Sequence, residues 1–113
     1  MNNANMLTKE HAISIVMEFI DKLQSEGIDI QKAILFGSYA NNCQTEWSDI
    51  DLALVSDSFT GFGFNDKSSF AKINCQKPYS IIQTKTFPTT YFDQGDPFID
   101  QIKKMGIVLF QKN

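Results

Sequence analysis

The sequence contains no arginine: all ten basic residues are lysines, and the net charge is −3. Arginine is the side chain that holds a phosphate through two parallel hydrogen bonds. A phosphate site in this chain must therefore use backbone N–H groups, hydroxyls, metal ions, lysines or an arginine from a partner. The acidic balance also argues against general nucleic-acid binding, which usually needs a basic face.

Cysteine and histidine are almost as scarce, with only Cys43, Cys75 and His11. The two cysteines have no C-x-x-C spacing, and nothing else completes a zinc site. Two free thiols fit the reducing cytosol. His11 lies near the start of a predicted helix, where a surface or capping role is expected.

Long apolar runs are also missing, so no segment is expected to cross a membrane. The first ten residues lack the charged segment and apolar core of a secretory signal, which predicts a cytoplasmic protein. The length of 113 residues, with 42% apolar and 20% charged residues, predicts one globular domain over residues 1–113.

Two amphipathic helices can be read from the sequence. The first is predicted over 8–26, where apolar residues recur at three- and four-residue steps between an N-cap at Thr8 and a stop at Gly27. The second is predicted over 96–105, with Asp96 as its N-cap.

Strands account for most of the remaining pattern, because short apolar and β-branched runs lie between turn residues. Residues 56–77 show no clear period, and only a short helix near 66–73 is expected there. A turn or single helical turn is expected at 88–91. The result is an α/β (α+β) fold, a small mixed sheet with helices packed on it. The predicted strands are 32–36, 48–55, 79–87 and 107–111.

The strand at 48–55 carries two carboxylates on one face. Side chains alternate along a strand, so Asp49 and Asp51 point the same way from neighbouring pleats. Like charges this close repel each other and cost stability unless a cation lies between them. Carboxylates together with substrate phosphates are the ligands that Mg²⁺ favours.

A Gly37-Ser38 turn directly follows the buried strand 32–36. Glycine lets the backbone approach a phosphate closely, and N–H groups and the serine hydroxyl can bind the anion. Together with the two aspartates, this turn would hold a metal-bound triphosphate. The chemistry implied is in-line attack on the α-phosphate with release of pyrophosphate.

The arrangement Gly37-Ser38-x10-Asp49-x-Asp51 resembles the signature of the DNA polymerase β nucleotidyltransferase superfamily. The short length and the ending DPFIDQIKKMGIVLFQ look like the minimal nucleotidyltransferases of bacteria and archaea. The resemblance covers most of the chain and is weakest over 56–77.

This resemblance implies a nucleotidyltransferase fold that uses ATP or another nucleoside triphosphate with Mg²⁺ or Mn²⁺. Asp49 and Asp51 would be the metal ligands and catalytic carboxylates, and Gly37 and Ser38, together with Ser48, would bind the nucleotide. The competing interpretation is a polar turn and two solvent-facing aspartates on an edge strand.

The family also uses a third carboxylate on a later strand, here expected at 79–87, which contains no Asp or Glu. The position falls at Gln83, with Ser80 as the other candidate. Glutamine cannot act as a base and is a weak Mg²⁺ ligand. A loop carboxylate or a partner protein could supply the missing charge, or the chain binds nucleotide and transfers it slowly or not at all. The loop candidates are Asp57, Asp66 and Asp93.

Several other side chains have two interpretations. Trp47 could stack on a base or, as the favoured alternative, pack over the rim of the site. Lys85 could contact phosphate or be a solvated strand lysine. Three phenylalanines could form a partner surface or close the core under a loop: Phe59, Phe62 and Phe64.

Three functions follow from the sequence. The first is transfer of a nucleoside monophosphate, in particular AMP, to an acceptor. Its resemblance to minimal nucleotidyltransferases implies a small helical HEPN toxin as partner and acceptor. The second is a catalytically impaired antitoxin that masks its toxin by contact. The third is a nucleotide-sensing domain without a stable protein partner, and self-association as a homo-oligomer is left open.

Overall fold

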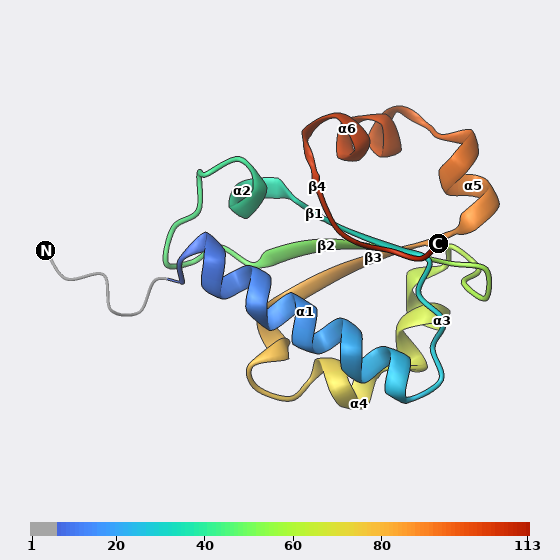
Figure 1. Cartoon of the computed structure of the whole chain (residues 1–113), viewed down its shortest axis with the longest axis horizontal. Coiled ribbons are helices and arrows are strands. Elements are labelled where there is room, and N and C mark those ends of the chain that lie inside the picture. Colours follow the sequence, from blue (N-terminus) through green and yellow to red (C-terminus); the bar gives the residue numbers. More distant parts are fainter. Residues whose placement is uncertain (1–6) are drawn as a thin grey trace, which may run out of the picture.

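A computed structural model describes residues 7–113 and builds them around one four-stranded sheet (Figure 1). The strand order is β3-β2-β1-β4, and β1 runs antiparallel to both β2 and β4, whereas β2 and β3 are parallel. The predicted mixed sheet is therefore confirmed. The strands are β1 (Lys32–Phe36), β2 (Ile50–Ser56), β3 (Ile82–Pro88) and β4 (Ile107–Gln111).

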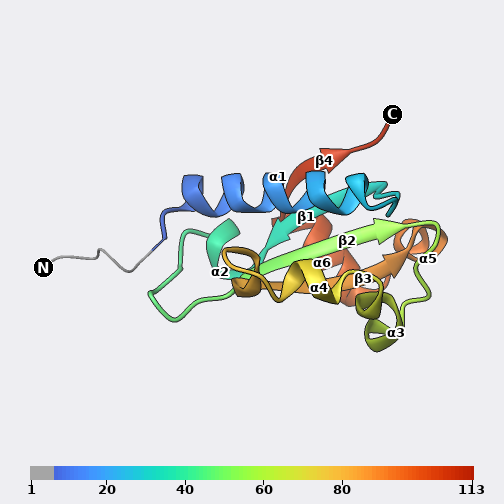
Figure 2. The same cartoon turned by 90° about the horizontal axis from the view of Figure 1, so that it is seen from below.

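Helix α1 (Lys9–Ser25) covers one face of the sheet (Figure 2). It begins as predicted, because the backbone N–H of His11 donates to Oγ1 of the N-cap Thr8 at 3.0 Å. The His11 side chain is exposed. The apolar stripe of α1 is buried against alternate residues of β1 and β2. Its buried members are Ala12, Ile15, Val16, Phe19, Ile20 and Leu23.

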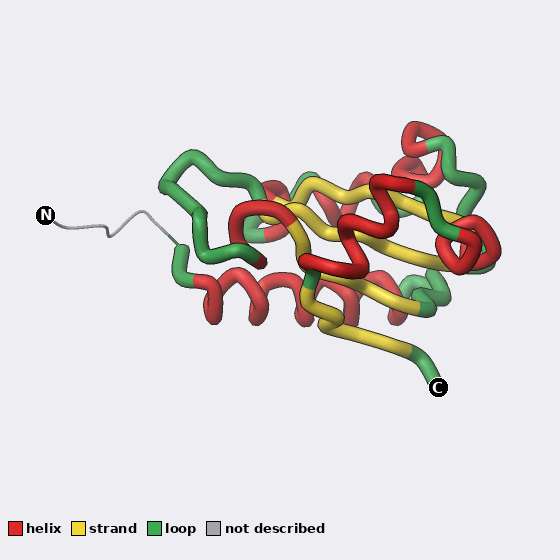
Figure 3. The backbone as a smooth tube through the Cα atoms, turned by 90° about the horizontal axis from the view of Figure 1, so that it is seen from above, coloured by secondary structure: helices red, strands yellow, loops and turns green. Residues whose placement is uncertain are grey.

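Helices α5 (Thr89–Gln94) and α6 (Pro97–Met105) lie on the opposite face (Figure 3). The Asp96 side chain caps α6 by accepting the N–H of Ile99 at 2.7 Å, as predicted. Buried side chains of both helices pack on the second set of alternate strand residues. This second core contains Ile34, Ala53, Val55, Phe87, Phe92, Ile99 and Ile102.

Helix positions between 56 and 81 differ from the prediction. The single helix expected at 66–73 is two short helices, α3 (Gly63–Ser68) and α4 (Ala71–Asn74). They separate at Ser69 and Phe70 because Phe70 turns inward and is 1% exposed.

The second and third strands, β2 and β3, begin later than predicted. The third does so because residues Tyr79–Ile81 form a 3₁₀ turn, η1. Pro78 lacks an N–H for a ladder, and the Tyr79 hydroxyl donates to Glu18 of α1, which holds the turn against the helix. Strand β2 begins at Ile50 because Ser48 is part of the preceding loop.

No helix within residues 7–113 is long and apolar enough to cross a membrane. Residues 1–6, part of the segment predicted to lack a secretory signal, lie outside the described residues.

Candidate functional site

Asp49 and Asp51 lie at the start of β2, which is a central strand between β1 and β3. The edge-strand alternative is therefore wrong. Asp49 is exposed and Asp51 is half-buried, on the face covered by α5 and α6. Asp51 is thus a half-buried carboxylate near the start of an otherwise apolar central strand.

Gly37 brings the turn directly against Asp51. Phe36, the last residue of β1, pairs in register with Asp51, so the chain leaves β1 beside that carboxylate. Gly37 has φ +74°, and a Cβ built on it would overlap Oδ2 of Asp51 and lie 3.0 Å from its Cγ. Only glycine fits here, because both the conformation and the space exclude a side chain.

Negative charge is concentrated at this point. Burial raises the pKa of Asp51, and the neighbouring Asp49 raises it further, while Lys85 of β3 lowers it. Burial and then Asp49 also raise the pKa of Tyr39, which is 1% exposed in α2 (Gly37–Ala40). A hard divalent cation would relieve this repulsion, so the donor set fits Mg²⁺.

Strand β3 places Gln83 opposite Asp51 in the parallel register. Ser80, the other candidate for the third position, lies in η1 outside the strand, so its assignment to the strand was wrong. In the described part of the chain, no three acidic, histidine or cysteine side chains gather as metal ligands. The site therefore has two carboxylates and an amide where the family resemblance led us to expect three carboxylates.

The loop carboxylates do not complete this set. Asp57 follows the last residue of β2, roughly 20 Å along the strand from Asp51 at ~3.3 Å per residue. Asp93 belongs to α5, which follows β3 at that same far end.

Asp66 is buried and already occupied by hydrogen bonds. It accepts the N–H and Oγ1–H of Thr60 at 2.8 and 2.9 Å, the N–H of Gly61 at 2.9 Å and the Oγ1–H of Thr86 at 2.7 Å. Burial raises its pKa, but these hydrogen bonds outweigh burial and hold the pKa below the usual value. Asp66 ties the loop to β3 and is not free to act as the third carboxylate.

The remaining predicted residues lie in α2 and in the loop between α2 and β2. The carbonyl of Ser38 accepts the N–H of Cys43 at 2.9 Å, and Oγ of Ser48 accepts the N–H of Thr45 at 2.9 Å. The Ser48 hydroxyl therefore closes the loop. Trp47 is 85% exposed, so the expectation that it packs over the rim is wrong: the Thr45–Ser48 turn directs it outward.

The three phenylalanines divide between the two interpretations. Phe59 is buried and closes the first core, whereas Phe62 and Phe64 are 71% and 90% exposed. Core closure was therefore the right expectation for Phe59 and the wrong one for the other two.

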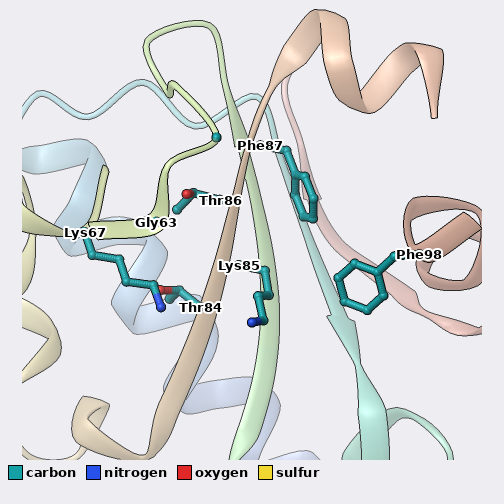
Figure 4. Close-up of a pocket in the computed structure, with 8 residues that line it drawn as sticks. Gly63, Lys67, Thr84, Lys85, Thr86, Phe87 and Phe98 are labelled. Atoms are coloured by element: carbon teal, nitrogen blue, oxygen red, sulfur yellow. The ribbon is translucent and has the colours of Figure 1, made fainter. Parts of the chain in front are cut away.

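A pocket of about 230 Å³ straddles β3 (Figure 4). Lys85, Phe87 and Phe98 lie on one side of the strand, and Lys67 and Thr84 on the other. The sequence predicted two possible roles for Lys85 but none for Phe98, because a phenylalanine at the start of an amphipathic helix is ordinarily part of the core. Its position follows from the packing of α6 on the sheet, where Phe98 contacts Phe36 of β1 and Phe87 of β3.

A comparison with protein families matches residues 18–113 to the family described as "Polymerase beta, Nucleotidyltransferase". The match includes the Gly37-Ser38 turn and the Asp49-x-Asp51 strand. Among curated proteins, no significant match is found.

Solved structures also resemble this fold. A crystal structure of a protein from Sulfolobus solfataricus assigned as a nucleotidyltransferase superposes with TM-score 0.68 and 13% identity, covering 92% of this chain and 84% of that one. A chain of a crystal structure of a toxin–antitoxin with AMP-PNP superposes with TM-score 0.61 and 19% identity, covering 89% and 74%. At these identities the likeness establishes the fold alone.

Proposed function

Because the chain belongs to the polymerase β nucleotidyltransferase family, we propose that it binds a nucleoside triphosphate, in particular ATP, with Mg²⁺ or Mn²⁺ at the end of the sheet where Gly37 contacts Asp51. The observation that carries this proposal is the contact of Gly37 with the Asp51 carboxylate. A phosphate-binding turn and a pair of metal-binding carboxylates thereby meet at one point.

Each residue of the proposed site would have a separate role in binding the metal and the nucleotide. Asp49 and Asp51 hold the cation, and the backbone of Gly37 and Ser38 binds the triphosphate. The bound metal would neutralise the negative charge that develops on the phosphates. Lys85, close enough to Asp51 to lower its pKa, adds a positive charge on the same face.

The proposed reaction is nucleotidyl transfer. An acceptor hydroxyl oxygen forms a bond to the α-phosphorus, the bond from that phosphorus to the bridging oxygen breaks, and pyrophosphate leaves. The hydroxyl proton passes to solvent or to a base supplied by the acceptor, because Gln83 cannot take it. We therefore expect slow transfer from this chain alone.

A helical HEPN-type toxin is the proposed acceptor and partner. The structural likeness to a chain of a toxin–antitoxin structure supports this choice. The partner could also supply the arginine that this chain lacks.

The competing proposal is an impaired antitoxin that masks its toxin by contact. It is favoured by one observation, the presence of Gln83 opposite Asp51. Masking requires neither metal nor nucleotide, so the two proposals differ in their dependence on the aspartates.

Label transfer separates the two. The protein is incubated with Mg²⁺, the candidate helical toxin and ATP labelled at either the α- or the γ-phosphate. Nucleotidyl transfer labels the toxin from α-labelled ATP only, and Asp49→Ala/Asp51→Ala abolishes labelling. The matched control Asp57→Ala/Asp93→Ala removes two exposed carboxylates at the far end of the sheet and should leave labelling intact. Toxin neutralisation that persists unlabelled in the Asp49→Ala/Asp51→Ala variant would favour masking.

A further inference from the structure

Phe98 is a large apolar side chain that stays 46% exposed at the edge of the candidate site. Its ring packs edge-on against Phe36 at a centroid distance of 5.8 Å, and it lies tilted by 45° against Phe87 at 6.4 Å. Phe36 is the register partner of Asp51, and Phe87 lies two residues beyond Lys85 on the same face of β3. Phe98 therefore lies on the sheet face between Phe36, which is beside Asp51, and Phe87.

The exposed part of Phe98 lines two hollows. One, of about 190 Å³, begins at Gly37 and is bounded by Gln101 and Met105 of α6. The other, of about 230 Å³, contains Lys85. Both hollows therefore connect Phe98 with residues placed at the triphosphate end of the site.

Phe98 is also held firmly in place. It is the second residue of α6, whose first turn is fixed because Asp96 accepts the N–H of Ile99 at 2.7 Å and the hydroxyl of Tyr91 at 2.6 Å. Ile99, the next residue, is fully buried. An aromatic ring on a capped and anchored helix loses little freedom when a ligand packs on it.

We propose that Phe98 is the stacking surface for the base of the nucleoside triphosphate, an inference that rests on the proposed function above. Every base has a π-face, and stacking on an aromatic side chain is a common way to bind one. Gln101, one helical turn further and lining the same hollow as Gly37, offers amide groups to the edge of the base.

The other exposed aromatics are placed less well for this role. Trp47 projects from a loop at 85% exposure, without the ring contacts that hold Phe98. Phe62 lines a separate hollow between the Asp66-anchored loop and α5, which does not include Gly37 or Lys85.

Calorimetric titration with two ligands in Mg²⁺ buffer tests the inference. ATP carries a base, whereas inorganic tripolyphosphate carries only the charge. Phe98→Leu keeps an apolar side chain against Phe36 and Phe87 but removes the aromatic face. We expect it to weaken ATP binding by about tenfold and to leave tripolyphosphate binding within about twofold of the wild type.

Two further variants serve as controls. Phe98→Trp restores a stacking face and should retain ATP affinity. Phe64→Leu changes a 90% exposed phenylalanine elsewhere and should change neither affinity.

Three results would overturn the inference. Equal weakening of ATP and tripolyphosphate by Phe98→Leu would assign Phe98 to the phosphate end or to general stability. Unchanged ATP affinity in Phe98→Leu would remove Phe98 from the site while leaving the proposed function intact. Failure of the wild type to bind either ligand would remove the proposed function itself and this inference with it.

Discussion

Gly37 joins the predicted phosphate turn to the predicted metal ligands. Its positive φ leaves the backbone in a conformation that costs an L-residue roughly 1–2 kcal/mol. Its missing side chain leaves room for Oδ2 of Asp51. Because glycine is needed here for two independent reasons, a substitution at Gly37 tests both its backbone conformation and its contact with Asp51.

Gly37→Ala should lower the free energy of unfolding by about 3 kcal/mol or more. The backbone strain of a positive φ and the overlap of the new Cβ with the Asp51 carboxylate both contribute to this loss. The matched control is Gly27→Ala: Gly27 has φ +86° but nothing within 4 Å of a new Cβ, so only the strain remains, about 1–2 kcal/mol. Adding Asp51→Ala to Gly37→Ala should recover most of the difference, as urea denaturation of these three variants beside the wild type would measure. Equal losses for the two glycine variants would mean that Gly37 and Asp51 are not in contact.

Asp51 is expected to destabilise the metal-free fold. Its pKa is raised above 3.8 in the folded state, so the ionised form costs stability as the pH rises through that folded pKa. Asp51→Asn should therefore raise Tm by roughly 2–4 °C at pH 7 in EDTA, and the gain should vanish as the pH falls well below 3.8, where Asp51 is neutral in both the folded and the unfolded chain.

The control for this measurement is Asp57→Asn, an exposed carboxylate beyond the far end of β2, which should leave Tm unchanged. A lower Tm for Asp51→Asn in EDTA at pH 7 would indicate that the carboxylate has a structural role instead.

At the scale of elements, the parallel pairing of β2 and β3 decides which side chain faces Asp51. That residue is Gln83, an amide of the same size as glutamate. The register therefore brings an uncharged amide, and not a third carboxylate, beside Asp51.

Gln83→Glu should strengthen Mg²⁺ binding by roughly tenfold, because a further negative charge lies beside Asp51. The same change should lower Tm in EDTA, since the added carboxylate repels Asp51 when no cation is present. Titration of Mg²⁺ in the presence of ATP gives the affinity, and Gln24→Glu on the exposed face of α1 is the matched control. Unchanged Mg²⁺ affinity would place Gln83 outside the metal site.

Elements with strong local signals were predictable from the sequence. The N-caps Thr8 and Asp96 and the strands at 32–36 and 107–111 lie where the pattern predicted them. Strands β2 and β3 were placed less well, because their starts depend on tertiary contacts. The Tyr79–Glu18 hydrogen bond and the Ser48 turn cannot be read from periodicity.

The site shows the same division. The spaced motif predicted that Gly37 and Ser38 lie near Asp49 and Asp51, and the structure places Gly37 against Asp51. The exposed position of Phe98 was not predicted, because it depends on how α6 packs across the strands. Asp66 was considered for catalysis because its hydrogen bonds to Thr60, Gly61 and Thr86 leave no trace in the sequence.

At the scale of the whole molecule, one sheet carries two cores and leaves the site at one end of the central strands. A ligand that binds only this folded arrangement stabilises the chain by mass action. Mg²⁺ with ATP at about 100 times the dissociation constant should add about 2.7 kcal/mol, which corresponds to a rise in Tm of roughly 10 °C or more.

Thermal unfolding should show this rise for the wild type and for Asp57→Ala/Asp93→Ala, and should lose it for Asp49→Ala/Asp51→Ala. A rise that survives in the variant without Asp49 and Asp51 would place nucleotide binding elsewhere on the molecule.

The most direct test of the site is an anomalous difference map from a crystal soaked with Mn²⁺ and a non-hydrolysable ATP analogue. The proposed site predicts a peak at the carboxylates of Asp49 and Asp51, with the triphosphate against Gly37 and Ser38. A manganese peak away from both aspartates, or a triphosphate that does not touch the Gly37-Ser38 turn, would contradict it.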